Sequence, residues 1–185
     1  INTGIGWQSL MLNVSGSYNS ALGHRTLENN LASYNTALGA YALNTNTGAN
    51  NTGVGRNALR TQNDTTSSSM YNTAVGANAG YAVTTGVENT LIGGLSGDAI
   101  TTGNNNTAMG VDAALCNTTA NENTAFGACA LRLNTTAATN TSTGIWNNTT
   151  PTSSVFTVGS DGDVNNNNEI IFSRYTNNWK TRVLS

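Results

Sequence analysis

Short runs of alternating apolar and polar residues recur along most of the chain at an almost constant spacing. Each run usually has the order Asn, Thr or Ser, a small residue, a bulky apolar residue and Gly. The leading asparagines are separated by 17, 16, 16, 21, 17, 17, 17 and 17 positions. Nine copies begin at Asn2, Asn19, Asn35, Asn51, Asn72, Asn89, Asn106, Asn123 and Asn140. Self-similarity at a near-fixed period predicts a repeat architecture.

The alternation favours strands over helices, because the fixed Gly, Asn and Thr residues of each repeat weaken a helix. A coil of 16 to 17 residues fits two strands of about five residues and two turns. Stacked coils share hydrogen bonds at a spacing of about 4.8 Å and bury one continuous interior. We therefore predict an all-β fold, a parallel β-roll or β-solenoid of about nine coils over residues 1–146.

The two faces of each strand differ in bulk, and this difference predicts an interior and a contact surface. The bulky residue shares a face with the motif Thr, since strand side chains alternate, and this face is expected to fill the interior. The same face is expected to continue past the motif Gly to a small residue, such as Ala42 or Ala58. The bulky residues are Ile5, Leu22, Leu38, Val54, Val75, Ile92, Met109 and Phe126.

Four further expectations concern the turns and the assembly. Isolated apolar residues of the turns are expected to point inward: Leu12, Leu31, Val83, Ile100, Leu115 and Leu133. The repeated asparagines are expected to lie above one another and form an amide ladder. The longest spacing contains residues 62–69, interpreted as a surface loop that leaves the stack intact. The flat face of small residues and glycines is expected to pack against sister chains in a homotrimer, with a monomeric solenoid as the alternative.

The period ends after Gly144, and residues 147–185 are expected to form a separate C-terminal β segment. Alternating runs at residues 154–159 and 169–175 predict two strands, and residues 179–184 are a candidate for a third. Arg174, Lys180 and Arg182 are expected to contribute to a tip or a docking surface. No a/d heptads follow the repeats, so no coiled-coil stalk is expected.

Composition supports an ordered chain and excludes some partners. Charged residues make up 9% of the chain and the formal net charge is −2, whereas disordered chains normally carry high net charge. No basic run or basic-aromatic run indicates nucleic-acid binding. No apolar segment approaches the roughly 20 residues that cross a bilayer. The chain starts at Ile1 without a signal peptide, which indicates a fragment or a processed product.

The residues give no strong indication of catalysis or of a cofactor. His24 is the only histidine and has no local carboxylate or cysteine partner. Glu88 and Glu122 both precede a motif Asn, two coils apart, and strand spacing places them roughly 10 Å apart, near the separation in inverting glycosidases. Solvated turn charges explain this pair more simply than a sugar-cleaving spike does.

Two other groups of residues bear on a metal site and on a disulfide. Residues 161–169 place oxygen side chains at alternate positions, as calcium loops do, but lack the expected Gly and the closing Glu. A hairpin turn is the favoured interpretation, so no metal site is predicted. Cys116 and Cys129 occupy different places in their repeats, which favours two unpaired thiols over a disulfide.

The Asn-Thr-Ala-x-Gly-x-x-Ala-Leu pattern at residues 35–43 and 123–131 resembles a known repeat. It is similar to the head repeats of trimeric autotransporter adhesins and to repeats of bacteriophage tail fibres and other virion fibres. The resemblance covers residues 1–146 and implies a left-handed β-roll assembled as a homotrimer. The β-rich C-terminal segment, in place of a heptad stalk, favours the phage family.

The resemblance to phage fibres implies a non-enzymatic structural protein on the virion surface. Its partners would be other virion proteins and a host cell-surface glycan or protein. The alternative is an adhesin head on the bacterial outer surface. Recognition is expected to use outward positions after each motif Gly, and Trp7, Tyr41 and Tyr81 are candidates for stacking on sugars. The candidate receptor contacts are Arg25, Tyr41, Asn57, Asn78 and Asp112.

Overall fold

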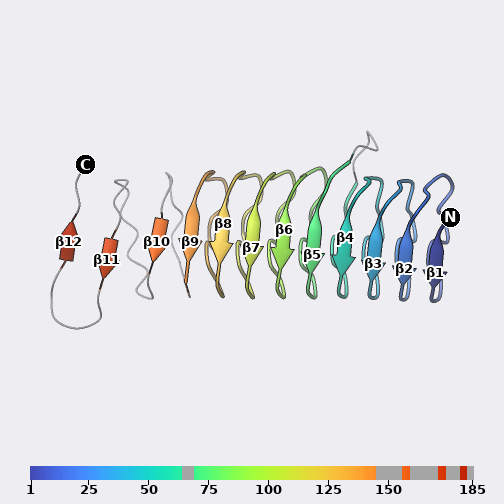
Figure 1. The fold of residues 1–185 in the computed structure, drawn as a ribbon, viewed down its shortest axis with the longest axis horizontal. Coiled ribbons are helices and arrows are strands. Elements are labelled where there is room, and N and C mark those ends of the chain that lie inside the picture. The colour runs from blue at the N-terminus through green and yellow to red at the C-terminus, as the bar shows by residue number, and fades with distance from the viewer. Residues whose placement is uncertain (64–68, 145–155, 159–170, 174–179, 183–185) are drawn as a thin grey trace.

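The structure, a computed structural model, describes residues 1–63 and 69–144, together with the backbone of three short strands beyond them. Within this part the chain contains no helix and twelve strands of three residues each, which form one sheet in chain order (Figure 1). The strands are β1 (Thr3–Ile5), β2 (Ser20–Leu22), β3 (Thr36–Leu38), β4 (Thr52–Val54), β5 (Thr73–Val75), β6 (Thr90–Ile92), β7 (Thr107–Met109), β8 (Thr124–Phe126), β9 (Thr141–Thr143), β10 (Phe156–Val158), β11 (Ile171–Ser173) and β12 (Lys180–Arg182).

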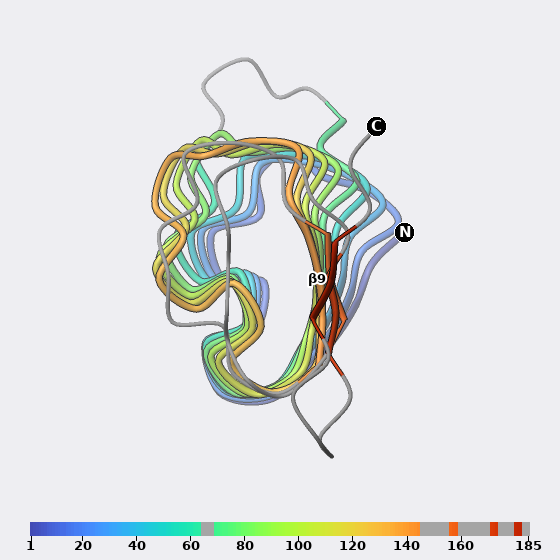
Figure 2. The ribbon, with the colours of Figure 1, turned by 90° about the vertical axis from the view of Figure 1, so that its left-hand side faces the viewer.

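The first nine strands belong to the nine sequence repeats, and each pairs in parallel with the next, which confirms the β-solenoid. Equivalent residues lie opposite each other, for example Leu38 and Val54 in β3 and β4. A view along the stack shows the successive coils nearly superimposed (Figure 2). Each coil contributes one strand of three residues, however, and turns form the rest of the coil. The predicted second strand of each coil is therefore wrong.

The stack stays in register across the longest spacing, as predicted. Thr52 in β4 pairs with Thr73 in β5, and Ala49 forms a bridge with Ser69. The middle of the inserted segment, residues 64–68, lies outside the described residues. At the other end, β10, β11 and β12 fall within the three predicted C-terminal runs. β10 pairs in parallel with both β9 and β11, and β11 pairs antiparallel with β12. The hairpin expected between the first two C-terminal runs is therefore wrong, since a hairpin joins antiparallel strands.

The assignment of the two strand faces to inside and outside was wrong. The middle residue of β2–β9 is buried, and it is small in every one of these strands except β6, as at Ala21, Ala37 and Ala74. The equivalent Gly4 of β1, at the end of the stack, is exposed. The bulky residue beside the middle position faces outward. Phe126 is 56% exposed and Leu38 is 44% exposed. The small-residue face therefore lines the interior of each coil, and it is not available for contact with sister chains.

The motif glycine explains why the residues that follow it face the same interior as the small strand residues. Gly55 has a φ of 128°, and the glycines at the equivalent positions range from 124° to 141°, a region that residues with a Cβ rarely adopt. The chain turns there, so the strand alternation does not continue past the glycine. Ala58, three residues after Gly55, consequently faces the same interior as the buried small residues of the strands.

The interior is narrow, and an opposing column of leucines already fills it. An added Cβ at Gly53 would meet Leu43 Cγ at 3.2 Å, so the space beyond a strand residue holds little more than a methyl group. Where Leu91 replaces the small strand residue, the opposing positions are Gly80 and Gly97, and their added Cβ atoms would each lie 2.7 Å from a Leu91 methyl. Large and small residues thus exchange sides while the packed volume is kept.

The apolar residues of the turns are not all buried, although all of them were expected to point inward. Val83 and Ile100 are fully buried as predicted, and Leu115 and Leu133 are half-buried. Leu12 and Leu31 are exposed, which contradicts the prediction for them. Asn13, Asn30 and Asn46 occupy interior-facing turn positions in those first coils and form their own hydrogen bonds, from Asn30 Nδ2 to Asn13 Oδ1 and from Asn46 Nδ2 to Asn30 Oδ1.

The predicted asparagine ladder is confirmed at the corner that precedes each strand. The motif asparagines from Asn19 to Asn140 are almost completely buried. The backbone N–H of Asn106 donates to Asn89 Oδ1 at 3.0 Å, and that of Asn123 donates to Asn106 Oδ1 at 3.1 Å. Each side-chain amide therefore accepts a hydrogen bond from a backbone N–H of the following coil. Without it, that N–H would be buried with no hydrogen-bond partner.

Candidate functional site

The five candidate receptor contacts share one column, at the second position after the motif glycine. Their backbones are left-handed, with φ between 53° for Arg25 and 61° for Tyr41 and Asn57. Arg25, Tyr41, Asn78 and Asp112 are partly exposed. Asn57 is buried and donates from Nδ2 to Asn78 Oδ1 at 2.9 Å, so these two amides are largely engaged with each other. Their role in recognition remains a prediction.

Two of the candidates belong to a continuous row of ring and guanidinium contacts along the first five coils. Trp7 stacks on His24 with ring centroids 5.0 Å apart, and His24 meets Tyr41 edge-on at 5.1 Å. The guanidinium of Arg25 lies 5.1 Å from the centroid of the Trp7 ring. We name this surface the aromatic–arginine ridge; it comprises Trp7, His24, Arg25, Tyr41, Arg60 and Tyr81.

Arg60 lies at the centre of the ridge between two tyrosine rings. Its guanidinium carbon is 5.0 Å from the centroid of Tyr41 and 5.7 Å from that of Tyr81, and its Nη1 donates to Tyr81 Oη at 3.2 Å. Sequence reasoning missed Arg60, which lies five residues after the motif glycine, because that position was assigned a role in recognition only where it holds an aromatic residue. The signal was Tyr81 at the equivalent position one coil later.

The cations of the ridge differ in their partners. Arg25 Nε donates to Gln8 Oε1 at 2.6 Å and lies 3.8 Å from Glu28 Oε1, so its charge is partly balanced. Arg60, and Arg56 beside the ridge, have no carboxylate within ion-pair distance among the described residues. The ridge therefore carries net positive charge on a chain whose overall charge is −2.

In later coils, acidic residues occupy the turn positions that hold arginines in the ridge: Asp98 is equivalent to Arg60, and Asp112 to Arg25. Arg132 Nε lies 3.6 Å from Asp112 Oδ2. Burial raises the pKa of Asp98 above its ordinary value of 3.8, and the nearby negative charge of Asp112 raises it further. Both effects disfavour the charged form of Asp98.

Replacing Asp98 by asparagine is expected to raise the stability of the chain at pH 7. Because the folded-state pKa is above the unfolded value, the native state binds the proton more tightly. The associated stability is present below pH 3.8 and is lost as the pH rises through the higher folded-state value. Urea unfolding midpoints of wild type and Asp98→Asn should therefore differ at pH 7 and converge near pH 3.5. A variant less stable than wild type at pH 7 would contradict this assignment.

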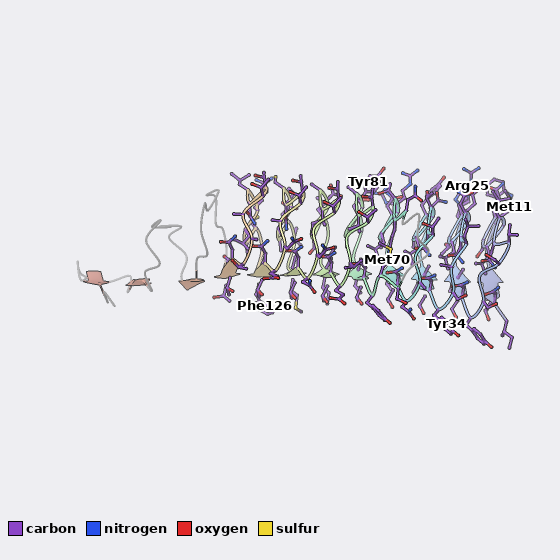
Figure 3. The ribbon with its side chains drawn as sticks, turned by 90° about the horizontal axis from the view of Figure 1, so that it is seen from above. Met11, Arg25, Tyr34, Met70, Tyr81 and Phe126 are labelled. Carbon is purple, nitrogen blue, oxygen red and sulfur yellow. The ribbon has the colours of Figure 1, made fainter. Side chains whose placement is uncertain are left out.

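A second surface lies on the outer side of the sheet. The eight bulky residues of β1–β8 form one outward column. Tyr18 and Tyr34, one position before the motif asparagines, stack beside it with ring centroids 5.2 Å apart. We name the column and these tyrosines, with exposed Tyr71, the apolar sheet face. Figure 3 shows Tyr34 and Phe126 projecting on this side, whereas Met11, Arg25 and Tyr81 project on the opposite side.

The remaining candidates are not brought into a common site. Glu88 and Glu122 are exposed, with Asn105 in the same column between them. Cys116 and Cys129 are free thiols, as expected. No group of three or more potential metal ligands occurs among the described residues, and residues 161–169 lie outside them. Over the same described ranges no helix is long and apolar enough to cross a membrane.

Comparisons of the chain with protein-family models, with curated proteins and with solved structures gave no match.

Proposed function

We propose that this chain is a segment of a homotrimeric, non-enzymatic fibre of a bacteriophage virion and takes part in attachment to a host surface. The observation that carries the proposal is the apolar sheet face. It repeats once per coil over the eight strands β1–β8, in a stack of nine strands that is roughly 40 Å long at about 4.8 Å per strand. A continuous apolar surface of this length is typical of a protein interface.

Sister copies of the same chain are the occupants that fit this face best. The column has the constant period of the coils, so copies placed around an axis parallel to the stack meet like residues at every level. Burying the exposed half of one bulky side chain contributes roughly 1 kcal/mol. Five of the eight side chains in the column are exposed to roughly this degree, and Val54, Ile92 and Met109 are more covered. This arrangement keeps the proposed trimer but replaces the small-residue contact surface with the bulky one.

Replacing Leu38 by glutamate is expected to dissociate the trimer, because three carboxylates would be buried close to one another. Sedimentation equilibrium should give three times the 19.1 kDa chain mass for wild type and the single-chain mass for Leu38→Glu. Met11→Glu is the matched control, since Met11 is similarly exposed, at 49%, but projects on the opposite side (Figure 3). A monomeric wild-type chain would contradict the proposed assembly.

Attachment itself is tested by measuring saturable binding of the labelled trimer to a panel of bacterial cells. Binding to some strains and competition by unlabelled trimer are expected. Absence of binding to every strain would contradict the attachment role. Capsid and tail genes beside the full-length gene would support the phage assignment, whereas a membrane-anchor barrel in the full-length product would favour a bacterial adhesin.

A further inference from the structure

We propose that the aromatic–arginine ridge binds a linear acidic polysaccharide whose chain runs parallel to the stack axis. The inference rests on the proposed attachment function for its biological role, and it names the chemical class of the receptor. The ridge and the apolar sheet face lie on opposite sides of the stack (Figure 3), so trimer contacts through the sheet face leave the ridge accessible.

The aromatic residues of the ridge offer ring surface at successive levels of the stack. Trp7 is 59% exposed, and His24, Tyr41 and Tyr81 follow it in the second, third and fifth coils. Five coils at about 4.8 Å per step make a ridge roughly 20 Å long, which suits a short run of sugar units. Neighbouring side chains cover ring faces along the stack, as His24 covers Trp7 and Arg60 covers both tyrosines. A ligand parallel to the axis therefore meets mainly ring edges and their polar atoms, which suit the hydroxyl groups of a sugar.

The charge of the ridge selects an acidic ligand over a neutral one. Tyr41 and Tyr81 hold the Arg60 guanidinium between their rings, which reduces its freedom before a ligand binds. The Tyr81 hydroxyl accepts from Nη1, and no carboxylate among the described residues neutralises the group. A guanidinium binds a carboxylate or sulfate through two parallel hydrogen bonds.

The distribution of charge along the stack limits the ligand to the first half of the chain. Arg25, Arg56 and Arg60 belong to coils two to four, whereas Asp98 and Asp112 belong to coils six and seven. An acidic chain that extended past Tyr81 would approach these carboxylates. The binding segment is therefore short, and its acidic groups are expected to align with Arg60 and Arg56.

The proposal is tested by isothermal titration of the full chain with tetragalacturonate, a carboxylated oligosaccharide, and with neutral maltotetraose. Tetragalacturonate is expected to bind and to lose affinity at high salt, and maltotetraose to bind at least tenfold more weakly. Arg60→Gln is expected to weaken tetragalacturonate binding about tenfold, and Arg60→Lys to retain part of the affinity. Arg132→Gln, which removes a guanidinium paired with Asp112, is the control and should change the affinity less than twofold.

Unchanged affinity in Arg60→Gln, with the trimer mass preserved, would overturn the proposal. Equal binding of the neutral sugar, or tighter binding of oligo-dT than of tetragalacturonate, would overturn it as well. Cell binding distinguishes failure of the ridge proposal from failure of the attachment function. If Arg60→Gln adsorbs to cells like wild type, the ridge is not the receptor site, but the attachment function stands. If wild type binds tetragalacturonate but no cells, the ridge proposal stands and the attachment function fails.

Discussion

Replacing Gly93 by alanine is expected to destabilise the solenoid by about 3 kcal/mol or more. Gly93 has a φ of 131°, and an added Cβ would lie 2.6 Å from the carbonyl carbon of Gly110 in the next coil. Strained backbone of this kind costs about 1–3 kcal/mol, and overpacking adds about 1–3 kcal/mol. The neighbour that would be struck is backbone, which cannot move without disturbing the stack. The urea unfolding midpoint, measured at fixed chain concentration, reports the loss.

Gly94 is a matched control one residue away. Nothing lies within 4 Å of a Cβ added there, and its φ is outside the left-handed region. Ala40, Ala77 and Ala128 occupy the equivalent position in other coils. Gly94→Ala is therefore expected to leave stability unchanged or to raise it by about 0.5 kcal/mol, since alanine restricts the unfolded chain. Equal effects of the two substitutions would show that the glycine column does not set the coil spacing.

Replacing Asn106 by alanine is expected to cost about 3 kcal/mol or more, because this amide serves several buried groups at once. Its Oδ1 accepts from the backbone N–H and Nδ2 of Asn123, each at 3.1 Å. Its Nδ2 donates to Asn89 Oδ1 at 3.0 Å and to the carbonyl oxygen of Ala120 at 2.9 Å. Each buried group left without a partner costs about 1–3 kcal/mol. The change in urea unfolding midpoint measures the total.

Asn105 supplies the comparison, because it is an exposed asparagine next to Asn106 that lies outside the ladder. Its φ of 57° favours Asn or Gly, so Asn105→Ala is expected to cost about 1 kcal/mol or less. If Asn106→Ala were no more destabilising than Asn105→Ala, the buried ladder would not be a major source of stability.

The sequence was sufficient to predict the elements that depend on the period alone. The spacing of the asparagines places strands one coil apart, and the pairing of Thr36 with Thr52 follows directly from it. Burial of the asparagine column was predictable for a physical reason, since a polar residue repeated at one corner can satisfy its neighbours only through a ladder. The insertion before β5 was predicted as a loop because the motif resumes unchanged after it.

The inside and outside of the strands required the coil geometry. Strand alternation correctly separates Ala37 from Leu38, but it does not say which face is enclosed. The bulky residues were assigned to the interior because apolar side chains are usually buried. The turn leucines had already filled that space. The sequence does carry one signal of a shared interior that sequence reasoning missed, the exchange of bulk between Leu91 and the glycines Gly80 and Gly97.

The candidate site was predicted in part. Arg25 and Tyr41 were found because they lie next to the turn at the motif glycine. Their contacts with Trp7 and Arg60 join different columns of neighbouring coils, and such contacts depend on side-chain directions at left-handed positions. A count of residues from the glycine cannot supply those directions.

Cysteine cross-linking tests the outward orientation of the bulky column and its burial between copies most directly. Single cysteines at position 37 or 38, in a chain with Cys116 and Cys129 replaced by serine, are treated with a short bifunctional maleimide under native conditions. Leu38→Cys is expected to yield covalently linked chains, and Ala37→Cys is expected to remain unreactive until the protein is unfolded. Linked chains from Ala37→Cys together with an unreactive Leu38→Cys would contradict the account.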